Sequence, residues 1–114
     1  MKLPNHERAW IPQAKITEYL LSFTHRDGRH KAEFFVRFDF TAASWETLAA
    51  ALLRHAADHE VAKIEESPFG RRYVVEGELQ APDGRAPLVR TVWFIEIEGS
   101  VPWLVTAYPI GRRT

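Results

Sequence analysis

Apolar residues recur every three or four positions in the first half of the chain and at every second position in much of the remainder. The first spacing is typical of an amphipathic helix, and the second is typical of a half-buried strand. The change falls near Asp58, so a helical part precedes a part made of strands. This pattern predicts an α+β domain in which three N-terminal helices pack on one face of an antiparallel sheet.

Three segments of the first half have the helical spacing, namely residues 13–21, 29–38 and 45–57. Pro12 suits the first turn of the first helix, and Ser44 is a good N-cap for the third. The middle segment is ambiguous, because its apolar residues fit a helical face and a strand face equally well. Good helix formers in residues 29–33 favour the helix.

Four segments of the second half are predicted strands, namely residues 61–66, 71–80, 88–98 and 101–108. Turn signals separate them, so hairpins connect neighbouring strands in sequence order. Such connections predict a four-stranded antiparallel meander. The expected core combines residues of the third helix and of the strands: Trp45, Leu48, Leu52, Val92, Phe94 and Val105.

The register of the sheet depends on the lengths of two hairpin loops. If Asp83-Gly84 and Gly99-Ser100 are both two-residue loops, Thr91 lies opposite Glu76 and Tyr108. The same register places four polar residues on one sheet face, namely Glu76, Thr91, Thr106 and Tyr108. An error of one residue in either loop would scramble this cluster, because side chains alternate between the two faces.

The composition narrows the class of protein. A chain of 114 residues, 46% of them hydrophobic, is expected to form a single domain over residues 1–114, with a frayed tail at 110–114. The absence of cysteine excludes a disulfide scaffold and a thiolate metal site. Fifteen basic and fifteen acidic side chains cancel, which argues against a protein that coats nucleic acid but not against a local basic site.

The apolar runs are too short to cross a membrane, and the N-terminus has no apolar signal region. We therefore expect a cytoplasmic protein that does not enter a membrane. The sequence has no phosphate-binding loop, dinucleotide fingerprint, zinc-protease motif or nucleophile elbow. No cofactor is expected.

The densest polar group is the segment from His25 to Lys31. Its last residues open the predicted 29–38 helix, where free N–H groups and basic side chains favour an anion. Metal-free RNA cleavage needs a base, an acid and cations, and all these residue types are present. The candidates are His25 and Lys31 for catalysis, with Arg26, Arg29 and His30 for substrate binding. The alternative is a solvated loop of mixed charge.

His55 and His59 are four positions apart near the end of the third predicted helix. This spacing can hold one metal ion between two imidazoles, but no third ligand is specified. Histidine near a helix C-terminus is also favoured by the helix dipole. We expect an ordinary surface pair and no metal.

Three parts of the sequence are similar to one known family: residues 15–21, residues 25–35, and the strand segments 90–93 and 104–109. Together they resemble an uncharacterised family of short bacterial domains of unknown function, which occur alone or at the ends of larger proteins. The resemblance extends from about Leu3 to Pro109.

A more distant resemblance is to toxin nucleases of the barnase, EndoU, colicin and RelE kind. These proteins share a helical N-terminal part packed on an antiparallel sheet, and many cut RNA without a metal. The resemblance implies that His25 is a general base or acid and that Lys31 stabilises phosphate charge. It also implies that Thr91 and Tyr108 position the substrate. The neutral net charge departs from the basic character of many such toxins.

The sequence thus favours a small metal-independent ribonuclease or ribonuclease-like toxin domain with RNA as its partner. The alternative is a non-catalytic interaction module, of immunity or accessory type, that binds an inhibitor or another protein. The uncharged apolar strand 101–108 predicts either a homodimer or a helix that covers its exposed edge.

Overall fold

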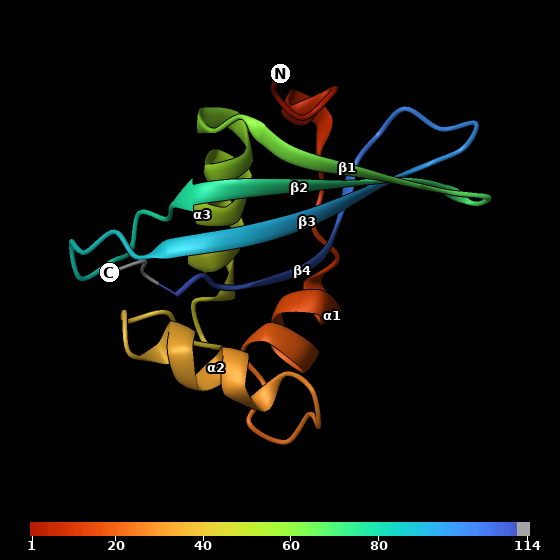
Figure 1. Cartoon of the computed structure of the whole chain (residues 1–114). Helices are drawn as coiled ribbons and strands as arrows, with labels where there is room; N and C mark the ends of the chain where they lie inside the picture. The colour runs from red at the N-terminus through yellow and green to blue at the C-terminus, as the bar shows by residue number, and fades with distance from the viewer. Residues whose placement is uncertain (112–114) are drawn as a thin grey trace.

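The computed structural model describes residues 1–111 and confirms the predicted order of elements (Figure 1). The helices are η1 (His6–Arg8), α1 (Gln13–Lys15), the π-helical turn η2 (Ile16–Leu20), α2 (Arg29–Val36) and α3 (Trp45–Asp58). The ambiguous middle segment is therefore a helix. Residues 112–114 of the expected frayed tail lie outside the described part. The Ile110 N–H still donates to the Leu88 carbonyl at 3.1 Å.

The strands are β1 (Val61–Ser67), β2 (Gly70–Glu78), β3 (Leu88–Glu96) and β4 (Trp103–Pro109). They form one sheet in the order β1-β2-β3-β4, and each neighbouring pair is antiparallel. The predicted meander is confirmed.

The helices lie on one side of the sheet and beside one of its edges. In Figure 1, α3 runs behind the strands, whereas α1 and α2 lie beyond β4. No helix crosses the face of the sheet that is turned to the viewer. We call this face the open face and the opposite one the helix-covered face.

The core lies between α3 and the helix-covered face. Leu48, Leu52, His55 and Ala56 are the buried residues of α3, and their spacing places them on one side of the helix. They face buried residues of the strands, including Val75, Trp93 and Leu104. Leu48 and Leu52 are buried in this core as expected. Val92 is also buried, but it lies on the open face, and Trp45, Phe94 and Val105 are only half-buried.

The predicted register is wrong by one residue. Thr91 lies opposite Val75 and Ala107, so it faces the helices, whereas Glu76 and Tyr108 both lie opposite Arg90. For β2 and β3 the hairpin explains the shift, because Ala81 pairs with Arg85 around a three-residue loop rather than a two-residue one. For β3 and β4 the connection is longer than the expected two residues, since the last pair is Phe94 and Trp103. Gly84 adopts a left-handed φ of 87°, as expected for the last loop position of such a hairpin.

The β4 strand has a second irregularity and a covered edge. Val92 lies opposite Thr106 but Trp93 lies opposite Leu104, so Val105 is the extra residue of a bulge. Trp10 forms a short parallel bridge to β4: its N–H donates to the Pro102 carbonyl at 3.1 Å, and its carbonyl accepts from the Leu104 N–H at 3.2 Å. A segment of the same chain therefore occupies part of the edge for which a homodimer was considered.

The helices of residues 1–111 are too short or too polar for a bilayer span.

Candidate active site

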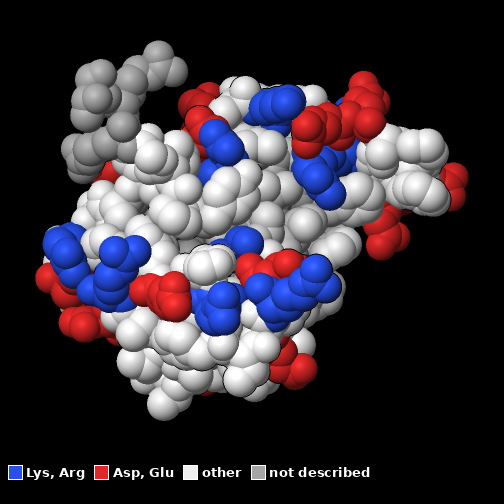
Figure 2. Space-filling model, turned by 60° about the horizontal axis from the view of Figure 1, so that its bottom comes forward, with Lys and Arg blue, Asp and Glu red and all other residues white. Residues whose placement is uncertain are grey.

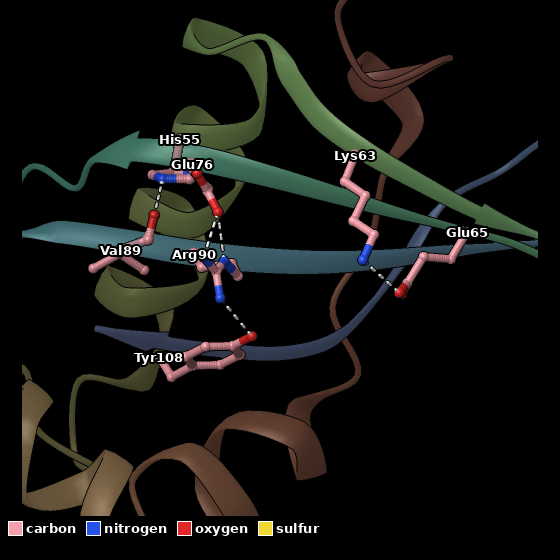
Figure 3. Close-up of polar contacts among 7 residues, drawn as sticks. All are labelled: His55, Lys63, Glu65, Glu76, Val89, Arg90 and Tyr108. Carbon is pink, nitrogen blue, oxygen red and sulfur yellow. Dashed lines mark hydrogen bonds and ion pairs between the residues drawn. The ribbon is translucent and has the colours of Figure 1, made fainter. Parts of the chain in front are cut away.

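Three polar side chains form a row across the open face, one from each of three neighbouring strands. Glu76 of β2, Arg90 of β3 and Tyr108 of β4 lie side by side in the register. The Arg90 Nε donates to Glu76 Oε2 at 2.6 Å, and its Nη1 donates to the Tyr108 hydroxyl at 3.3 Å (Figure 3). These hydrogen bonds, first that of Tyr108 and then that of Glu76, raise the pKa of Arg90. We call these residues the polar row.

Two side chains of the helical part extend this row beyond the edge of the sheet. The Lys31 ammonium of α2 lies 6.0 Å from the ring centre of Tyr108 and 5.3 Å from that of Tyr19 in η2. Such distances are typical of cation–π contacts. The Tyr19 hydroxyl lies 3.0 Å from Thr106 Oγ1 on β4. A cation, two phenols and a threonine thus connect α2 to the polar row.

The ring of Tyr19 separates His25 from the sheet. Its ring meets Tyr19 edge-on, with 4.9 Å between the ring centres. Its Nδ1 accepts the backbone N–H groups of Asp27 and Gly28, both at 3.0 Å. Neutral His25 must therefore carry its proton on Nε2, so this nitrogen is a donor. In this state Nε2–H can donate a hydrogen bond to a substrate oxygen.

The turn that carries His25 packs tightly against η2. A Cβ at Gly28 would lie 2.1 Å from the Tyr19 carbonyl oxygen, so only glycine fits there. The Arg29 N–H donates to the His25 carbonyl at 3.0 Å. Together with the two bonds to the His25 ring, this accounts for the N–H groups of residues 27–29. The expectation of a free helix N-terminus for an anion is therefore wrong for these groups.

The other predicted binding residues are not drawn into the polar row. Arg26, Arg29 and His30 are exposed, and His30 Nδ1 lies 3.5 Å from Glu33 Oε1. Figure 2, which brings the α1 and α2 side forward, shows Lys and Arg interleaved with Asp and Glu. Among residues 1–111, this surface has no extended area of one sign.

Thr91 lies on the wrong face for the predicted site. Its side chain is fully buried, where Oγ1 accepts the indole N–H of Trp93 at 2.9 Å and lies 3.2 Å from His55 Nδ1. The structure thus brings Lys31 close to Tyr108, with His25 across Tyr19, and separates Thr91 from all three.

His55 is a structural residue and not the surface histidine that we expected. Only 2% of it is exposed, and its Nε2 lies 2.9 Å from the Val89 carbonyl (Figure 3). The same nitrogen lies 3.1 Å from the Gly77 carbonyl. Burial, followed by the neighbouring His59, lowers the pKa of His55. Neutral His55 donates from Nε2 and accepts the Thr91 hydroxyl at Nδ1. Neither ring nitrogen is left to bind a metal.

Sequence reasoning missed Arg90 and Tyr19. Arg90 was placed on the face away from Glu76 and Tyr108, because the lengths of both the β2–β3 and the β3–β4 connections were wrong. Tyr19 was read only as part of an amphipathic helix. Gly84 at the end of Pro82-Asp83-Gly84 is typical of a three-residue hairpin loop and could have placed Arg90 opposite Glu76. It gives no signal for the pairing of Arg90 with Tyr108, which depends on the β3–β4 connection.

Comparisons with known proteins identify one solved structure of similar fold and one sequence family. A search of curated proteins finds no match. One solved structure that is similar to this chain is a "Contact-dependent growth inhibition toxin - immunity protein complex from Klebsiella pneumoniae 342". The TM-score is 0.73 at 15% sequence identity, over 94% of this chain and 97% of that chain, which shows a shared fold. Residues 2–111 match the family described as Domain of unknown function (DUF6883), and the chain belongs to this family.

Proposed function

We propose that this domain is a small metal-independent ribonuclease of the toxin type, with the polar row, Lys31 and His25 as its active site. The observation that carries the proposal is the convergence of a carboxylate, a guanidinium, a phenol and an ammonium on an uncovered sheet face. The fold shared with a chain of a growth-inhibition toxin–immunity complex supports it. Such a toxin would act on RNA in the cytoplasm.

Each of these side chains can serve one step of RNA cleavage. Glu76 takes the proton of the ribose 2′-hydroxyl, and the 2′-oxygen attacks the phosphorus. The bond from phosphorus to the 5′-oxygen then breaks. The leaving oxygen takes its proton from water, while His25 Nε2–H donates a hydrogen bond to it. Arg90 and Lys31 stabilise the charge that develops on the phosphate, and the Tyr108 hydroxyl orients it. The products are a 2′,3′-cyclic phosphate and a 5′-hydroxyl.

The test is incubation of the purified protein with RNA in the presence of a chelator. We expect fragments that end in a cyclic phosphate. Glu76→Gln should lower kcat/KM by about 100-fold or more, the loss expected for a general base. Glu78→Gln is the matched control, because Glu78 is exposed two residues further along β2. The proposal fails if the parent leaves the RNA intact. It also fails if Glu76→Gln and Glu78→Gln cleave RNA at the same rate.

A second candidate function is a non-catalytic interaction module of immunity or accessory type. Two large apolar side chains at the far end of the sheet favour it: Phe69 is 76% exposed and Ile97 is 71% exposed. They are neighbours, since the Ile97 N–H donates to the Phe69 carbonyl at 3.0 Å. Exposed apolar patches commonly mark binding surfaces.

Expression of the domain alone distinguishes the two functions. A ribonuclease toxin should arrest growth, and Glu76→Gln should relieve the arrest. An interaction module should be harmless, and Glu76→Gln should change nothing.

A further inference from the structure

A hollow of about 450 Å³ adjoins the polar row on the open face. The register places three rows of side chains along it, each row two residues from the last. The first is the polar row, the second contains Val74 and Val92, and the third contains Arg72. Val74 and Val92 therefore lie between the guanidinium groups of Arg90 and Arg72 in this hollow.

The two guanidinium groups differ in their partners. Arg90 is held by Glu76 and Tyr108, whereas Arg72 is exposed and forms no ion pair with residues 1–111. The neighbouring Arg71 pairs with Glu66 at 3.3 Å. Lys63, the other cation of the hollow, pairs with Glu65 at 3.2 Å (Figure 3). Glu65 lies opposite Arg72 in the register but pairs with Lys63, which leaves the Arg72 guanidinium without an ion-pair partner among residues 1–111.

The separation of the rows indicates an extended ligand. Arg90 and Arg72 lie on neighbouring strands and are offset by four positions, which corresponds to about 13 Å along the strand direction. One small anion does not fill this length. A ligand with an anionic group at each end and a flat apolar part between them does.

We propose that the hollow binds one unpaired nucleoside of a single-stranded nucleic acid, with Arg72 on the phosphate beyond it. The inference rests on the proposed function, because the phosphate at the other end is the one placed on the polar row. The flat face of the base lies against Val74 and Val92. Only an unpaired base can turn toward the protein in this way, so the substrate is single-stranded.

The experiment measures binding without cleavage. Fluorescence anisotropy follows a labelled single-stranded DNA of about eight nucleotides, which lacks the 2′-hydroxyl. Arg72→Ala should weaken binding about 5-fold and lower the slope of log K against log salt by about 0.7, because one phosphate contact is lost. Arg72→Lys should keep the parental slope. The control is Arg54→Ala, an exposed arginine on α3 behind the sheet, which should bind like the parent.

The proposal is overturned if Arg72→Ala and Arg54→Ala bind alike. It is also overturned if the matching duplex or an oligoglutamate peptide binds more tightly than the single strand. Cleavage of RNA is measured separately, so the two proposals fail independently. Binding that depends on Arg72 in a protein that leaves RNA intact supports the nucleoside site and contradicts the ribonuclease.

Discussion

His25 and His55 both use their ring nitrogens to hold parts of the fold together. The Nδ1 of His25 accepts two backbone N–H groups ahead of α2. His55 joins α3 to the Gly77 and Val89 carbonyls and to the Thr91 hydroxyl. They differ in exposure, because His55 is buried, whereas His25 is half-exposed. This difference leaves His25 free to serve the proposed chemistry.

The first prediction separates the structural and chemical roles of His25. His25→Asn keeps a side-chain acceptor for the two N–H groups, so its stability should stay close to that of the parent. His25→Ala removes the acceptor and should cost about 1 kcal/mol of unfolding free energy, as loss of a helix cap does. Both variants should lose RNA cleavage. Urea denaturation and initial cleavage rates measure the two effects, and an active His25→Asn variant would remove His25 from the mechanism.

The second prediction concerns pH and His55. Burial holds its folded pKa below the value of 6.5 that applies to the unfolded chain. As the pH falls through 6.5, the unfolded chain takes up a proton that the folded protein does not. The unfolding free energy should therefore fall by up to about 1.4 kcal/mol per pH unit until the folded pKa is reached. Above about pH 7.5 this contribution should be constant.

Denaturation curves between about pH 7.5 and pH 5 measure this dependence. His55→Gln should lose the part of the slope that belongs to His55. His30→Gln is the control, because the His30 side chain is 79% exposed. Identical slopes in the parent and His55→Gln would show that His55 does not cause the pH dependence.

At the scale of elements, α3 fixes the helix-covered face of the sheet. Its buried residues lie on one side, whereas Trp45 at its first position is half-buried. Ser44 occupies the N-cap position, but its side chain makes no capping hydrogen bond. The helix therefore depends on packing against β2 and β3 more than on its cap.

The third prediction compares two substitutions in α3. Leu52→Ala should cost about 2–5 kcal/mol, because it leaves a cavity beneath the sheet. Trp45→Ala should cost less, since part of the indole is already in contact with water. Thermal or urea denaturation ranks the two variants, and a larger loss for Trp45→Ala would place that indole in the core.

At the scale of the whole molecule, the N-terminal segment protects both edges of the sheet. The Met1 carbonyl accepts the Val61 N–H at 2.7 Å at the start of β1, and Trp10 bridges β4. The exposed part of β1 carries charged side chains such as Lys63 and Glu65, which discourage strand pairing.

The fourth prediction tests the covered edge of β4. The parent should elute as a monomer of 13.1 kDa. Trp10→Pro removes the N–H that donates to Pro102 and should increase self-association. Trp10→Ala keeps the backbone bridge and should remain monomeric. Light scattering after size exclusion measures the masses, and a dimeric parent would contradict the prediction.

The candidate site was partly predictable from the sequence. Lys31 and His25 were identifiable because their residue types suit phosphate chemistry, and Tyr108 was implied by the resemblance to toxin nucleases. Thr91 and Arg90 were assigned to the wrong faces, because side chains alternate along a strand and a one-residue change in a loop exchanges them. No local pattern could show that Tyr19 lies between His25 and the sheet, since this contact joins residues far apart in the chain.

The sequence by itself determined the helices, the strands and their antiparallel order. These features depend on hydrophobic periodicity and on turn residues, which are properties of neighbouring positions. Only the tertiary structure decided which side chains of β4 share the open face, because the β3–β4 connection and the bulge at Val105 set the register there. It alone placed α2 beside β4, where packing of distant residues brings Lys31 to Tyr108. The polar row therefore arises from long-range contacts that hydrophobic periodicity does not encode.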